Sequence, residues 1–332
     1  MNPVTPNSIL RPVIMRQASD LRQQLQTASQ ELTSGNYADV TSAVRGDYSH
    51  LAATDHSLAR LSGYAATGAE LSLMASAMQK ALTVIHEAAQ NLAGAVLQTS
   101  GALSAAQLSA ASRQGAQDFE TTVMMLNSQL AGRPLFGGVQ LAQLPLPDAE
   151  TLLQDLELAV AGATTAEEVS ARVSAWLSDP GGFSSHYQGG APRNPLEISE
   201  GETAALQATA LDPALRDTLS GMMKMALLDR GLFTGDQESR AELSLSAGRD
   251  LVGSAEARLQ LAAGIGMTEQ KLARAQSRNS AEKAALEITR NGITNADQYE
   301  AAIRLKDLEA RLDAFYTLTA RLSRLTLTDY LR

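Results

Sequence analysis

The sequence contains no cysteine among its 332 residues, which excludes a disulfide framework and the usual thiolate metal sites. Aromatic residues make up only 4% of the chain, so its cores must consist mainly of aliphatic side chains. No run of about 18 apolar residues occurs, and we predict no membrane span. The N-terminal MNPVTPNSILRPVIMRQ lacks the basic start, apolar stretch and small-residue site of a cleaved secretory signal.

Basic residues are too few for a nucleic-acid surface, because 27 Lys and Arg face 36 Asp and Glu, a net charge of −9. The histidines His50, His56, His86 and His186 form no HExxH motif and no i, i+4 pair, so we predict no metal site. No nucleophile elbow or phosphate-binding loop is present. We therefore predict no enzymatic activity and no cofactor.

Proline divides the chain into three parts. Three prolines lie within the first 12 residues, seven lie between Pro134 and Pro213, and none follows. Proline in a helix interior costs about 3 kcal/mol, so the two proline-free arms predict long helices. With 44% hydrophobic residues, the chain has enough apolar surface to bury sizeable cores.

The middle part combines short helices with short strands. Its pattern predicts amphipathic helices over Asp148–Ala161 and Thr165–Leu177, and a helix from Pro213 to about Leu228 behind an Asp212 N-cap. Leu196–Ser199 predicts a strand, and Thr203–Thr209 fits either a strand or a helix.

The N-terminal arm has the alternating 3–4 spacing of a heptad seam. Gly35 is predicted to end the first helix, and Asn36–Asp47 reads as a connector. A polar break near Thr99–Gly101 separates the second helix from a third. The first seam comprises Ile14, Ala18, Leu21, Leu25, Ala28 and Leu32; the second comprises Leu71, Ala75, Met78, Leu82, Ile85, Ala89, Leu92 and Val96; the third helix carries Phe119, Val123, Leu126 and Leu130.

The C-terminal arm mirrors this pattern. Val252, Ala255, Leu259 and Ala262 predict one long helix over about 237–290, which Asn291-Gly292 should interrupt. The final helix repeats the alternation through Ala301, Leu305, Leu308, Leu312, Phe315 and Leu322.

The two terminal helices are expected to pair with each other. Each has a narrow apolar seam that an isolated helix cannot bury, and the other terminal helix is the nearest partner. The pair would be antiparallel, with the remaining seam covered by neighbouring copies of the chain. The predicted assembly interface comprises Ile14, Leu21, Leu25, Leu32, Leu305, Leu308, Leu312, Phe315, Leu322 and Leu331. For the central helices, we interpret the seams as intramolecular core.

The predicted fold class is mainly α and elongated. Long antiparallel helices form a coiled-coil core and a terminal stalk, with a small α+β region inserted in the middle. The predicted domains are 1–35 with 294–332 for the stalk, 36–145 with 236–293 for the core, and 146–235 for the inserted outer region.

Motifs at both ends of the chain resemble the flagellin superfamily, particularly its hook-associated branch. The Val44–His50 region departs from the paired-Asp motif usual there, which indicates a divergent connector. The resemblance rests on Glu31–Gly35 as a helix-ending ELSSG-type motif, Leu135–Gly138 as an LFGG turn, Asn291–Ile293 with Ala296-Asp297 as a joint, and Leu327–Leu331 as the closing segment.

This resemblance implies a structural subunit of the bacterial flagellum that joins hook to filament. The implied partners are a hook-side junction protein, flagellin, copies of the chain itself, the flagellar export apparatus and an export chaperone, with no nucleic acid and no membrane span. The implied location is extracellular, reached through the export channel without a cleaved signal peptide.

The same sequence features also fit other functions. The arms also fit a filament flagellin, and heptads without catalytic motifs fit a cytoplasmic coiled-coil scaffold or signalling protein. Arg45-Gly46-Asp47 spells an adhesion tripeptide, which often occurs by chance. Trp176 is expected to anchor the core of the middle region, whereas an exposed Trp176 would indicate an interaction patch.

Overall fold

The structure is a computed structural model that describes the backbone of residues 6–97 and 104–330, with side chains except those of residues 6–11, 42 and 322–330. The described residues fall into two compact units, unit 1 (Met1–Leu61 with Ala281–Arg332) and unit 2 (Ser62–Ser280). Long helices dominate both units, which confirms the mainly α prediction. The three-part domain division stays a prediction.

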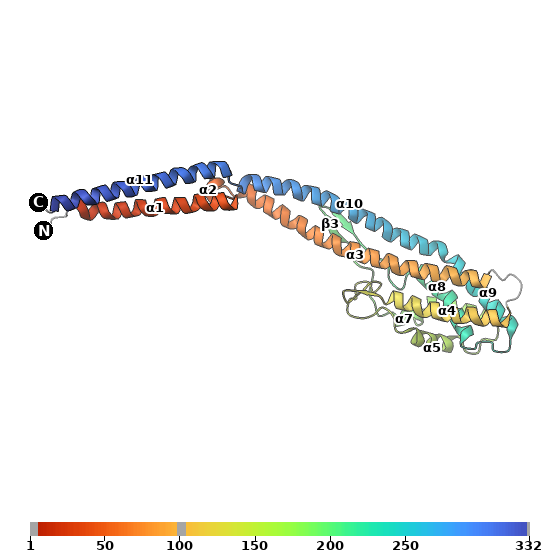
Figure 1. Cartoon of the computed structure of the whole chain (residues 1–332). Helices are drawn as coiled ribbons and strands as arrows, with labels where there is room; N and C mark the ends of the chain where they lie inside the picture. Colours follow the sequence, from red (N-terminus) through yellow and green to blue (C-terminus); the bar gives the residue numbers. More distant parts are fainter. Residues whose placement is uncertain (1–5, 98–103, 331–332) are drawn as a thin grey trace. The chain divides into compact units, whose positions relative to one another are not determined.

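Unit 1 is built from two antiparallel helix pairs. α1 (Pro6–Ser34) packs along α11 (Gln298–Tyr330), and the two lie side by side in Figure 1. After the short α2 (Val40–Ala43), the start of α3 (Ser49–Leu97) meets the end of α10 (Ala255–Thr294). Here Arg290 Nε donates to Asp55 Oδ1 at 2.7 Å.

In unit 2, the helical core centres on α8 (Pro213–Asp229), which packs against α4 (Ala105–Leu126) and α9 (Gln237–Gly253). α8 is buried on nearly every side, because α5 (Ala149–Val160) and α6 (Ala166–Ser178) also pack against it.

The remainder of α3 and α10 run antiparallel in unit 2. Gln79 Nε2 donates to the Ala262 carbonyl at 2.6 Å, and His86 lies opposite Arg258. The side chains of the α3 seam predicted from the sequence, from Leu71 to Val96, are buried in the main hydrophobic cluster.

Two small hairpins complete unit 2. The first pairs β1 (Gln129–Leu130) with β2 (Arg133–Pro134). The second pairs β3 (Leu196–Ser199) with β4 (Glu202–Ala204), so the first predicted strand is confirmed and the second is shorter than predicted. Beyond Ala204 the chain has no regular structure as far as Thr209.

Local sequence signals locate the starts of three helices as predicted. The side chains of Asp148, Thr165 and Asp212 each accept a hydrogen bond from a backbone N–H in the first turn of α5, α6 and α8. Trp176 is buried beside Phe183 at the start of α7 (Phe183–His186), and its Nε1 donates to Asp155 Oδ2 at 2.9 Å. Trp176 is therefore a core anchor, as expected.

The prediction of one helix over 237–290 was wrong. The chain forms α9 and α10 with Ser254 between them, and the predicted seam residues Val252 and Leu259 are 54% and 55% exposed. The buried positions lie one residue earlier and comprise Leu251, Arg258, Ile265 and Leu272. Because arginine is rarely buried, Arg258 was not recognised as a core position. The apolar pattern therefore indicated the adjacent positions Val252 and Leu259, which are exposed.

The break predicted at Asn291-Gly292 was also misplaced, because both residues belong to α10. Glycine in a helix interior costs only about 1 kcal/mol, which neighbouring contacts can offset. The connector predicted as irregular contains the short α2. The polar break predicted near Thr99–Gly101 lies outside the described residues.

The LFGG turn ties several segments of unit 2 together. Phe136 is buried, and its carbonyl accepts hydrogen bonds from Ala210 N and the Tyr187 hydroxyl. Arg193 donates to the Gly138 carbonyl from Nε at 3.0 Å and to the Pro134 carbonyl from Nη2 at 2.6 Å. The turn therefore joins the end of the N-terminal arm to the middle of the chain.

Candidate assembly site

The paired terminal helices hold most of the predicted assembly residues. Ile14, Leu21, Leu25 and Leu32 lie on α1, and Leu305, Leu308, Leu312 and Phe315 lie on α11. Their spacing of three and four places each set on one face of its helix. The Leu322 side chain and Leu331 lie outside the described residues. Participation of the whole set in assembly stays a prediction.

The pair covers its own seam incompletely. Leu308 is buried, as are the small residues Ala28 and Ala301. The other seven predicted side chains with a described position are each only partly buried: Ile14, Leu21, Leu25, Leu32, Leu305, Leu312 and Phe315. Two helices leave both edges of an apolar seam open to water, so the pair retains apolar surface that a further helix could cover.

Polar contacts fix the alignment of the two helices. Arg22 donates to the Tyr316 hydroxyl from Nε and Nη2, at 3.0 and 2.6 Å, with its guanidinium 5.8 Å from the ring centroid. Glu31 is buried, accepts from Ala38 N at 3.2 Å, and has its other oxygen 3.4 Å from Arg304 Nη1. Apolar periodicity could not reveal these contacts, because they depend on which turns face each other.

α1 ends and α11 begins at a joint where backbone hydrogen bonds connect the two segments. Gly35 adopts a φ of +71° after α1, and its carbonyl accepts from Ala296 N at 3.0 Å. Tyr37 N donates to the Thr294 carbonyl at 2.9 Å, and Asp297 Oδ1 accepts from Tyr299 N to cap α11. The ELTSG segment, predicted to end a helix, and the Ala296-Asp297 segment, predicted as part of a joint, thus meet through backbone hydrogen bonds.

α11 has a second apolar stripe on the face turned away from α1. Tyr299, Ile303 and Leu318 are 77%, 53% and 59% exposed. Successive steps of 100° place Tyr299 and Ile303 opposite the seam through Leu305 and Leu308, with Leu318 on the flank of that outer face. This stripe was not predicted from the sequence, although the four-residue spacing of Tyr299 and Ile303 indicates it.

Charge is distributed unevenly between the units. Unit 1 contains 13 basic and 13 acidic residues, whereas unit 2 contains 14 basic and 23 acidic residues. The net charge of −9 therefore lies entirely on unit 2. Copies of unit 1 can approach one another without net repulsion.

The adhesion-like tripeptide has a structural role. Asp47 Oδ1 accepts from Ser49 N at 2.9 Å and from Ser49 Oγ at 2.6 Å, where α3 begins. These hydrogen bonds to Ser49 lower the pKa of the Asp47 carboxyl. The geometry is that of a helix cap.

Within the described ranges, no three His, Asp or Glu side chains gather as metal ligands would. A separate search of the same residues finds no helix with the length and apolar character needed to cross a membrane. Two of the histidines make side-chain contacts, in which His186 Nε2 lies 3.0 Å from Asp155 Oδ2 and His86 Nδ1 accepts from Arg258 Nε at 3.5 Å.

Solved structures resemble this chain although sequence comparison finds nothing. No protein-family model matches, and no curated protein matches. A structure from Vibrio parahaemolyticus, provisionally assigned as a flagellar hook-associated protein, is 14% identical over 73% of this chain and 95% of its own, with a TM-score of 0.50. FlgL from Bacillus cereus is 16% identical over 74% of this chain and 100% of its own, with a TM-score of 0.43. The Vibrio match shows a common fold.

Proposed function

We propose that this chain is a structural subunit of the bacterial flagellum that sits between hook and filament, as hook-associated protein 3 does. The proposal assigns assembly to the α1–α11 pair and places the protein outside the cell, after export without a cleaved signal peptide. Its partners would be a hook-side junction protein, flagellin and copies of itself, with the export apparatus and an export chaperone acting before assembly.

The incompletely covered α1–α11 seam is the observation that carries this proposal. Leu21, Leu25 and Leu312 are half-buried in a single chain, and the outer stripe of α11 is more exposed still. Apolar side chains gain about 25 cal/mol for each Å² removed from water, so neighbouring helices would stabilise this arrangement. The electroneutral composition of unit 1 supports side-by-side packing of copies.

Two further observations favour a flagellar role. The fold is shared with a protein provisionally assigned as flagellar hook-associated. The LFGG turn at Leu135–Gly138 and the closing Tyr330-Leu331 resemble hook-associated protein 3 more than filament flagellin. No enzymatic role is assigned, because a packing surface rather than a catalytic cavity accounts for these features.

A deletion strain of the source organism tests the junction role. We expect it to export flagellin into the medium and to lose its filaments, while hooks remain visible by electron microscopy. Complementation with the intact gene should restore filaments. Intact filaments in the deletion strain would contradict the proposal.

The second candidate is a filament flagellin, which the same paired terminal helices would also suit. Mass spectrometry of sheared flagella separates the two. A junction subunit should form a minor fraction at one filament end, whereas a flagellin should form the bulk of the filament. Absence from both flagella and medium would instead favour a cytoplasmic coiled-coil protein.

A further inference from the structure

A cavity of about 340 Å³ lies in unit 2 where α6, α8 and the end of α9 meet. Its lining combines hydroxyl, basic and acidic side chains. These include Ser174 and Ser178 from α6, Arg216 and Asp217 from α8, and Arg249 and Asp250 from α9. The composition differs from the acidic character of unit 2 as a whole.

Two arginines on the wall have unused hydrogen-bonding capacity. Arg216 Nη1 donates to the Leu177 carbonyl at 3.1 Å, but its Nε is buried and has no partner among the described residues. Arg249 is exposed and forms no ion pair with any side chain that the structure describes. Arg216 Nε has no accessible surface and does not face the cavity, so the donors available there are Arg216 Nη2, which bonds to no described residue, and the Arg249 guanidinium.

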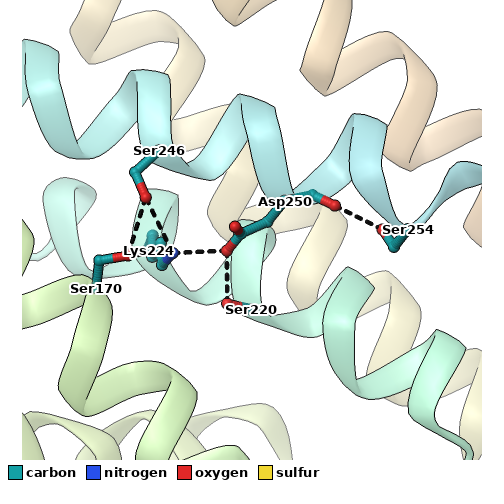
Figure 2. Close-up of polar contacts among 6 residues, drawn as sticks. All are labelled: Ser170, Ser220, Lys224, Ser246, Asp250 and Ser254. Carbon is teal, nitrogen blue, oxygen red and sulfur yellow. Dashed lines mark hydrogen bonds and ion pairs between the residues drawn. The ribbon is translucent and has the colours of Figure 1, made fainter.

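The negative charge of Asp250 is already compensated by the buried Lys224. Figure 2 shows the buried Lys224 side chain between Ser170, Ser246 and Asp250. Lys224 Nζ lies 2.6 Å from Asp250 Oδ2 and 2.6 Å from Ser170 Oγ, and Ser220 Oγ also donates to Asp250 Oδ2 at 2.7 Å. Asp250 therefore contributes little net negative charge to the cavity.

A second buried cation, Arg258, contacts Ser254, and Ser254 lines the cavity. The Arg258 guanidinium donates to Ser254 Oγ at 2.6 Å, to Thr218 Oγ1 at 2.9 Å and to the Leu251 carbonyl at 3.0 Å. All of these acceptors are neutral. Burial lowers the pKa of Arg258 to about 10, so the group remains charged at neutral pH.

The charges around the cavity sum to a positive value. Arg216, Arg249, Lys224 and Arg258 are basic, against the acidic Asp217, Asp250 and Asp212, the last of which interacts with Arg216. This is a local excess of one positive charge within a unit whose net charge is −9. An uncompensated buried cation is unfavourable, and an anion in the cavity would offset it.

We propose that this cavity is a binding site for a compact divalent oxyanion of the phosphate or sulfate type. Guanidinium groups present paired N–H donors that match the oxygens of such anions. Arg216 and Arg249 supply these donors, and the Ser174 hydroxyl supplies another. The site does not depend on the assembly role proposed above.

Calorimetric titration of the full chain with inorganic phosphate, and separately with sulfate, tests the site. Sodium chloride of equal ionic strength serves as the reference, because it reproduces general screening. We expect saturable binding of both anions by the wild-type chain. In Arg249→Gln, binding should weaken about tenfold, the effect of losing one charge-assisted hydrogen bond.

Two variants with intact folds sharpen the result. Asp217→Asn removes a repulsive charge from the wall and should tighten binding about twofold. Arg133→Gln removes an exposed positive charge that pairs with Glu70 outside the cavity, and should bind as wild type does. Circular dichroism confirms folding of each variant. No binding beyond the chloride reference, or equal affinities of Arg249→Gln and wild type, would overturn the proposal.

Discussion

At Gly138, the backbone requires the absence of a side chain. Its φ is +61°, and a Cβ added there would stand 2.3 Å from the Ala191 carbonyl oxygen. The same turn holds Gly137, whose carbonyl accepts from Gly190 N at 2.9 Å. Close backbone packing within unit 2 therefore explains why this turn contains glycine.

Gly138→Ala should destabilise unit 2 by about 2–4 kcal/mol, because left-handed strain adds to overpacking. Urea unfolding followed by circular dichroism measures this change. Gly132→Ala is the matched control, since Gly132 also has a positive φ but no atom within 4 Å of an added Cβ. Its cost should be only about 1–2 kcal/mol. Equal losses in the two variants would contradict the steric argument.

His86 introduces a pH dependence at the α3–α10 contact. Burial, together with the charge of Arg258, lowers the pKa of the His86 imidazole. Arg258 Nε donates to His86 Nδ1 at 3.5 Å, which requires the neutral imidazole. As pH falls through about 6.5, the unfolded chain binds a proton that the folded chain does not, so His86 lowers stability in acid.

His86→Gln should therefore reduce the loss of stability between about pH 7 and pH 5. Urea unfolding at several pH values gives the slopes for both proteins. From about pH 8 to 9, well above the ordinary histidine pKa of about 6.5, His86 is neutral in both states and the two curves should run parallel. Parallel curves below pH 6.5 as well would show that this histidine does not control the acid response.

At the scale of elements, α11 exposes apolar side chains on the face that α1 does not cover. One face packs on α1 through Leu308 and Leu312, and the opposite face exposes Tyr299 and Ile303. A surface helix of an isolated protein normally has a single apolar stripe. The second stripe is the reason to expect an additional helix from another copy beside α11.

Leu312→Asp should abolish incorporation into flagella and leave unit 2 folded. The change places a charge in a half-buried seam without a partner. Incorporation is measured by immunoblotting of sheared flagella from a complemented deletion strain, and folding by circular dichroism. Asp313→Ala, at the exposed neighbouring position, should incorporate normally. Normal assembly of Leu312→Asp would refute the role of the seam.

At the scale of the whole molecule, the net charge is confined to unit 2, whereas both units expose apolar side chains. Unit 1 has equal numbers of acidic and basic residues and carries the exposed α11 stripe, whereas unit 2 carries the full charge of −9. Crowding copies together therefore brings acidic units into proximity. Salt should screen this repulsion and leave the apolar contacts intact.

Self-association of the full chain should increase when sodium chloride is raised from about 0.05 to about 0.5 M, since the Debye length shortens to a few ångströms. Sedimentation velocity measures the association. A chain lacking residues 1–34 should lose this salt-dependent association, because α11 without α1 is only a marginal helix and no longer holds its apolar side chains in one ordered surface. Association that weakens with salt would instead indicate an interface held by ion pairs.

The sequence by itself determined the long helices, several of their ends and the pairing of the chain termini. Heptad spacing, proline placement and capping residues such as Asp148 and Thr165 act over a few neighbouring residues, so a linear pattern contains them. The same holds for the helix end at Gly35 and the buried Trp176.

Only the tertiary structure decided which face of α10 is buried, where the last joint lies and which polar groups are internal. Arg258 and Lys224 occupy core positions because Thr218, Ser170 and Asp250 come from other helices to satisfy them, together with Ser254 one turn before Arg258. Hydrogen bonds between distant residues compensate the cost of burying charge, and an apolar pattern along one helix contains no information about them.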